Sequence, residues 1–182
     1  EQFSNTLDLT TDAAGSVTQL GPLALPRDAR GRPARDLYDH AGRRLSSPPW
    51  NYRPYTQLHD AVGLVATLVE NQPRKYAPPL PGFQLSRRHD GAWELALLLP
   101  DRSVLAVLDD LGAAYQTSLY DPFGLANTES RPNYRYPKGY AGYLEYPADA
   151  PIPLLDAGLR LYAPTLGRFL RPDPVPPALD DP

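Results

Sequence analysis

The sequence predicts an all-β fold, built as a meander of antiparallel hairpins that forms a curled sheet or a segment of a shell. Three observations lead to this prediction. The pattern Asp-x-x-Gly occurs six times in the 182 residues. Runs of alternating apolar and polar residues follow several copies, and this is the period of a half-buried strand. Proline is frequent, with 23 residues, and it breaks long helices but is tolerated at strand ends and edges.

Each Asp-x-x-Gly copy predicts a tight turn between two strands. The aspartate at the first position caps the turn with its carboxylate, and the glycine at the fourth position tolerates a positive φ. The flanking strands then pair as a hairpin. A single copy is a common turn, but six copies favour a degenerate repeat. We assign a turn or structural role to Asp12, Gly15, Asp28, Gly31, Asp39, Gly42, Asp60, Gly63, Asp109, Gly112, Asp121 and Gly124.

The first elements are short strands between these turns, starting with the strand-like run 3–11. Segment 56–72 allows two interpretations. A helix would place Leu58, Val62 and Val65 on one face. A strand would alternate Leu64, Ala66 and Leu68 with their neighbours, and we favour the strand because a repeat turn precedes it.

Residues 73–82 predict a Pro-rich linker or a loop that covers a sheet edge. Clear strands follow at 83–87, 93–99 and 104–109, with turns between them. The tail 175–182 is expected to be extended.

The stretch 128–151 is rich in tyrosine. An aromatic face could bind sugars or bases, but packing within the fold is the favoured interpretation because β proteins often place tyrosine on half-buried faces. The residues concerned are Tyr134, Tyr136, Tyr140, Tyr143 and Tyr146.

Composition excludes several classes of function. The net charge of −3, with scattered basic residues, gives no footprint for nucleic acid. Cysteine is absent, which removes disulfides and thiol chemistry. His40, His59 and His89 have the spacing of turns and not of a metal site, so no metal and no cofactor is predicted. The chain begins with Glu1 and contains no methionine, so we expect a processed product or a piece of a longer polypeptide.

Three motifs close the chain: Leu119-Tyr-Asp-Pro-Phe-Gly124, the run Arg160-Leu-Tyr-Ala-Pro-Thr-Leu-Gly-Arg-Phe169, and Pro172-Asp-Pro174. Residues 98–174 resemble the C-terminal core of the Rhs/YD-repeat family, in which Tyr-Asp-x-x-Gly turns recur. The chain departs from the pattern at Arg102, where the family has histidine, and after Pro174, where Val-Pro-Pro follows.

The resemblance implies a β-shell that encloses a toxin. It divides the chain into degenerate YD-repeat hairpins at 1–72, the linker or loop at 73–82, the core at 83–174 and the tail at 175–182. The implied partners are other segments of the same precursor, or copies of the chain joined by strand pairing, and an encapsulated toxin. The implied location is secreted or at the cell surface.

The family's core releases its toxin by aspartyl autoproteolysis, and by motif Arg160 and Asp173 match two of its catalytic residues. The resemblance places a second aspartate further along, beyond Pro182. An aspartic protease needs two carboxylates. We therefore favour a buried structural ion pair between Arg160 and Asp173, with structural roles for Gly167 and Arg168.

The sequence thus favours a non-catalytic shell or scaffold segment of an exported toxin-delivery protein. A secreted, self-assembling, fibre-like subunit is one alternative, and a remnant of an autoprotease core is another.

Overall fold

The computed structural model describes residues 8–21, 23–25, 37–38, 44–47, 55–59, 64–69, 72–132, 134–146, 152–157 and 160–173. It confirms the all-β class. The regular structure of these residues consists of strands and two short 3-10 turns, η1 (Tyr140–Gly142) and η2 (Pro164–Leu166). The strands form three antiparallel sheets, and none of the sheets closes on itself. Within these residues, no helix has the length and hydropathy needed to cross a membrane.

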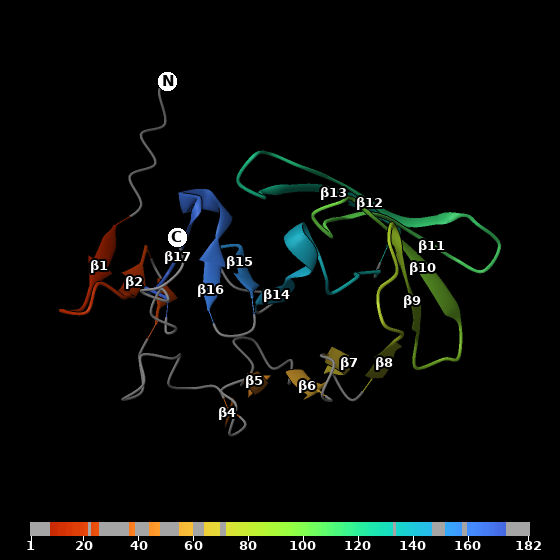
Figure 1. Ribbon diagram of the computed structural model, residues 1–182, viewed down its shortest axis with the longest axis horizontal. Coiled ribbons are helices and arrows are strands. Elements are labelled where there is room, and N and C mark those ends of the chain that lie inside the picture. Colours follow the sequence, from red (N-terminus) through yellow and green to blue (C-terminus); the bar gives the residue numbers. More distant parts are fainter. Residues whose placement is uncertain are drawn as a thin grey trace, which may run out of the picture.

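The largest sheet has ten strands, and each strand pairs with its neighbours along the chain. Figure 1 shows this sheet bending round the C-terminal strands. Its strands are β4 (Leu37–Tyr38), β5 (Arg44–Ser47), β6 (Tyr55–His59), β7 (Leu64–Val69), β8 (Gln72–Tyr76), β9 (Phe83–Arg87), β10 (Trp93–Leu98), β11 (Val104–Leu108), β12 (Ala114–Tyr120) and β13 (Ala126–Ser130).

Two smaller sheets share one hydrophobic core. The first contains β1 (Leu9–Thr11), β2 (Val17–Leu20) and β3 (Leu23–Ala24). The second contains β14 (Leu144–Tyr146), β15 (Leu154–Asp156), β16 (Leu161–Ala163) and β17 (Arg168–Phe169). The Val17 N–H donates to the Leu170 carbonyl at 2.7 Å, so β2 contacts the residue that follows β17. Val17, Leu20, Leu154 and Leu170 are almost fully buried in this core.

The ten-stranded sheet has a buried inner face and a more exposed outer face. The register aligns Gln84, Ala96, Val107 and Gln116 across four strands, and all four are buried. The inner face is rich in polar side chains, which must find hydrogen-bond partners when buried. Its buried polar residues are Gln57, Thr67, Gln84, Ser86, Glu94, Gln116 and Ser118.

The structure settles the ambiguous segment and corrects the predicted loop. Residues 56–59 and 64–69 of the ambiguous segment lie in β6 and β7, so the strand interpretation is confirmed for these residues. Residues 73–76, predicted to be a linker or loop, lie in β8, where Pro73 pairs with Leu68. A proline near the start of a strand costs the ladder little. The ten-stranded sheet therefore continues through this part of the chain.

Candidate functional site

The Asp-x-x-Gly turns share one geometry wherever the structure describes them. In the turn at Asp121, the carboxylate Oδ1 accepts the N–H groups of Phe123 at 2.9 Å and Leu125 at 2.8 Å. Gly124 donates to the Asp121 carbonyl at 3.0 Å, and its φ is +87°. The same carboxylate bonds and positive glycine φ recur at Asp12 with Gly15 and at Asp109 with Gly112.

The other three predicted turns lie outside the described residues. They comprise Asp28, Gly31, Asp39, Gly42, Asp60 and Gly63. The strand pairs β4–β5 and β6–β7 nevertheless carry a one-residue register shift, as β1–β2 and β11–β12 do. A β-bulge of this kind twists the strands and favours a curled sheet.

Two of the C-terminal motifs meet in space. A Cβ at Gly124 would lie 2.5 Å from the Tyr140 ring, and a Cβ at Gly167 would lie 2.7 Å from the Phe123 ring. The Tyr162 hydroxyl donates to the Phe123 carbonyl at 2.8 Å. The glycines therefore allow the Asp121 turn to dock directly on the C-terminal sheet.

Aromatic rings extend this junction. The ring of Tyr140 lies 5.8 Å from that of Tyr120 and 6.1 Å from that of Tyr162. Tyr162 in turn meets Phe169 edge to face at 5.3 Å. Such pairs stabilise packing beyond the area they bury. The rings join η1 and β12 to the motif run of β16 and β17.

Residues 134–143, which we call the crossing segment, lie along the inner face of the ten-stranded sheet. Buried side chains of the sheet hold its backbone. The Tyr136 N–H donates to Gln116 Oε1 at 3.0 Å, and the Ala141 N–H donates to Ser103 Oγ at 2.8 Å. Lys138 Nζ donates to Gln84 Oε1 at 2.7 Å. The crossing segment thus supplies hydrogen-bond partners for Gln84, Ser103 and Gln116.

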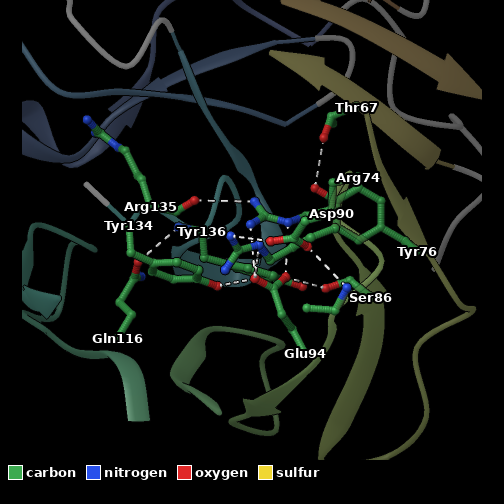
Figure 2. A network of polar contacts seen from close by, with 12 residues as sticks. Thr67, Arg74, Tyr76, Ser86, Asp90, Glu94, Gln116, Tyr134, Arg135 and Tyr136 are labelled. Carbon is green, nitrogen blue, oxygen red and sulfur yellow. Dashed lines mark hydrogen bonds and ion pairs between the residues drawn. The ribbon is translucent and has the colours of Figure 1, made fainter. Parts of the chain in front are cut away.

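The centre of this contact is Glu94, whose side chain is 1% exposed (Figure 2). Arg74 Nε lies 3.0 Å from Oε2, and Arg74 Nη2 donates to Oε1 at 3.1 Å. Ser86 Oγ donates to Oε2 at 2.9 Å, and the Tyr134 hydroxyl donates to Oε1 at 2.8 Å. Each carboxylate oxygen therefore lies next to two donors, and together the donors come from β8, β9 and the crossing segment. A buried charge is tolerated when it is paired and hydrogen-bonded in this way.

The motifs in the sequence did not predict this network. One signal was available, because Glu94 is the one charged residue in the run Trp93-Glu-Leu-Ala-Leu-Leu98. A charge inside a strand of this kind needs a partner if it is buried. The identity of the partner could not be read from spacing, because Arg74 and Tyr134 lie on either side of it at long range.

Burial shifts the titration of the side chains around Glu94. It raises the pKa of Tyr76 to about 12, and burial together with the charge of Glu94 raises the pKa of Tyr134. Burial, aided by the charge of Arg102, lowers the pKa of the Lys138 ammonium to about 8. This ammonium also lies 4.3 Å from the centre of the Tyr76 ring.

Most of the tyrosine-rich stretch packs inside the fold. Tyr136 is fully buried and meets Tyr76 edge to face at 6.4 Å. Tyr134 stacks on Tyr115 at 4.6 Å. Tyr140 and Tyr143 pack against Tyr162. These contacts occupy the ring faces that a sugar or a base would need.

The two residues matched to the autoprotease motif do lie together. Arg160 Nη2 is 3.0 Å from Asp173 Oδ2, and the guanidinium sits 3.8 Å from the centre of the Phe169 ring. The pair is not buried as expected, since a quarter of the Arg160 side chain and half of the Asp173 side chain are exposed. Arg160 directly precedes β16, and Asp173 follows β17.

Gly167 directly precedes the last strand, and Arg168 begins it. Gly167 ends η2 with a φ of +62°, and its N–H donates to the Pro164 carbonyl. Arg168 is exposed and pairs with Ala163 in the β16–β17 ladder. Across the described parts of the chain, no three His, Asp or Glu side chains converge as metal ligands would.

No protein-family model and no curated protein matches the sequence. Solved structures do match. A Tc holotoxin pore of Photorhabdus luminescens with a substituted TccC3 has a TM-score of 0.65 at 14% identity, covering 91% of this chain. The crystal structure of TcdB2–TccC3–TEV has a TM-score of 0.61 at 17% identity, covering 83%. That of TcdB2–TccC3 has a TM-score of 0.58 at 17% identity, covering 93%.

The match covers nearly all of this chain but only 9% of the length of each of those chains. At this level of identity, the likeness concerns the fold. The chain therefore shares its curled antiparallel architecture with a part of the Tc toxin chains TcdB2–TccC3.

Proposed function

We propose that this chain is a non-catalytic wall segment of a β-shell in an exported toxin-delivery protein of the Rhs/YD-repeat type. One observation carries the proposal. The ten-stranded sheet curls, and in the described part of the chain its end strands, β13 and β4, each pair on one side only. Such edges are templates for further strands, so the wall can be extended.

The partners follow from this arrangement. Other segments of the same precursor, or copies of the chain, continue the wall by strand pairing at the edge of β4, and a toxin lies within the completed shell. The crossing segment stiffens the wall, because its polar bonds to Gln84, Glu94 and Gln116 hold the curl from inside. The secreted or cell-surface location belongs to the same proposal, and so does the absence of a catalytic role.

A protection assay on the full-length precursor tests the proposal. The wild-type precursor is expected to keep its enclosed polypeptide intact under a protease that digests the same polypeptide when it is free. Gly167→Val should expose it, because the added side chain clashes with Phe123. Gly82→Ala is the control, since nothing lies within 4 Å of its Cβ. Equal digestion in the wild-type precursor and free in solution would disprove the shell function.

A fibre-like subunit is the second candidate, and it is favoured by the same pair of open edges on one sheet. Electron microscopy of the purified chain separates the two functions, because only the second predicts filaments. Cleavage tests the non-catalytic role. Asp173→Asn in the full-length precursor is expected to give the same polypeptide fragments as the wild type, whereas loss of a cleavage product would indicate an autoprotease.

A further inference from the structure

The free edge of β13 presents a defined set of backbone groups. The Arg131 N–H donates to the Tyr115 carbonyl at 2.8 Å, and the Leu125 carbonyl accepts the Asp121 N–H at 3.1 Å. The odd-numbered residues of this strand therefore point their N–H and C=O groups toward β12. Because successive residues of a strand alternate, the even-numbered residues Ala126, Thr128 and Ser130 point theirs away from the sheet.

These three residues line a groove of about 590 Å³. Gln116, Asn127 and Tyr134 continue its lining on the side of the sheet. The opposite wall is formed by residues 153–155, at the start of β15, and by Pro164. The groove thus runs beside the edge of β13 and is closed on its far side by the C-terminal sheet.

We propose that this groove takes up one extended polypeptide strand, which pairs with the backbone of β13. Alternating N–H and C=O groups along an edge are complementary to another peptide backbone, which satisfies both at the strand spacing. All side chains of β13 are exposed, so among the described residues none covers the edge.

The source of this strand is an unfolded segment of the polypeptide that the shell holds, and this part rests on the proposed function. Pairing through the backbone depends little on the side chains of the bound strand, so it gives little sequence specificity. The outward-pointing residues Ala126, Thr128 and Ser130 are small and uncharged, and the charged residues of the groove lining, Arg135 and Glu145, pair with each other. A site of this kind holds different polypeptides with similar strength, which suits a shell whose contents vary.

A labelled peptide tests the strand groove directly on the isolated chain. The probe is a ten-residue peptide of alternating threonine and valine with a terminal fluorophore, and its control carries N-methyl groups on alternate amides. We expect the unmethylated peptide to bind, and to slow hydrogen exchange at the amides of Ala126, Thr128 and Ser130. The methylated peptide should do neither. Equal binding of both peptides, or unchanged exchange at these three amides, would overturn the proposal.

Two variants of Thr128 separate backbone pairing from side-chain binding. Thr128→Pro removes an outward N–H that β12 does not use, and proline is tolerated at such edge positions. This variant is expected to bind the labelled peptide about tenfold more weakly and to keep the melting temperature of the wild type. Thr128→Val keeps the N–H and should bind as the wild type does. Loss of binding in Thr128→Val alone would refute backbone pairing, whatever the outcome of the protection assay on the precursor.

Discussion

Gln57 and Asp156 form a buried hydrogen bond between two sheets. Gln57 Nε2 donates to Asp156 Oδ2 at 2.8 Å, and both side chains are almost fully buried. Gln57 lies in β6 of the curled sheet, and Asp156 lies in β15 of the C-terminal sheet. The bond joins residues 99 positions apart, so it fixes the position of the C-terminal sheet inside the curl.

Gln57→Leu should therefore loosen the contact between these sheets. Removing a donor to a buried carboxylate costs about 1–3 kcal/mol of unfolding free energy. Urea denaturation measures this loss. The adjacent residue Leu58 is half exposed on the other face, and Leu58→Gln should change the unfolding free energy by less than about 0.5 kcal/mol. Similar values for the two variants would argue against the bond as a sheet-to-sheet link.

Two turn glycines in equivalent positions should respond differently to alanine. Gly112 and Gly124 have φ values of +82° and +87°. Alanine in this conformation costs about 1–2 kcal/mol at either site. A Cβ at Gly124 also meets the Tyr140 ring, which adds about 1–3 kcal/mol for overpacking, whereas a Cβ at Gly112 meets nothing within 4 Å. Thermal denaturation of the two single variants gives the difference, and equal losses would contradict the docking of the Asp121 turn.

Glu94→Ala is expected to be severe. It leaves the buried Arg74 guanidinium without its carboxylate, and breaking a buried pair on one side costs about 3–5 kcal/mol. Replacing both partners, as in Glu94→Leu with Arg74→Met, should cost less than Glu94→Ala alone because no charge remains buried. Chemical denaturation compares them. A double variant that is less stable than Glu94→Ala would show that the pair is not the main contribution of these residues.

Stability should depend on pH in opposite directions on the two sides of about pH 10. Lys138 titrates at about 8 in the folded chain and near 10.4 when unfolded, so the unfolded state binds more protons between these values and stability rises with pH. Tyr76 and Tyr120 titrate at about 12 when folded and near 10 when unfolded, so stability falls above pH 10. Denaturation at pH 7, 9 and 11 measures both limbs. In Lys138→Met the rise in unfolding free energy between pH 8 and 10 should disappear. If the rise persists, it comes from the titration of another group.

The strands could be predicted from sequence because their signals are local. The alternation at 83–87 and 104–108 and the turn between flanking strands lie within a few residues of each other. In the turn at Asp109, all bonds of the carboxylate to the backbone fall within five residues. Local geometry of this kind does not depend on how the rest of the chain is arranged.

The inner-face contacts could not be predicted because they depend on the curl. Glu94 meets Arg74 from β8 and Tyr134 from the crossing segment only after the sheet has bent over that segment. The strand β8 was not predicted because proline is uncommon within strands, so Pro73 favoured a loop. The sequence placed Arg160 beside Asp173, but not at the surface, since exposure depends on what packs above the pair.

The order of the strands in the curled sheet has a consequence for biosynthesis. Since each strand from β5 to β13 pairs with its predecessor, a nascent chain can add these strands one at a time as it emerges. The contacts between Val17 and Leu170 and between Gln57 and Asp156 are different, because each joins residues far apart in the sequence. Assembly is therefore expected to begin strand by strand and to finish with these long-range contacts, which carry the larger loop-closure entropy.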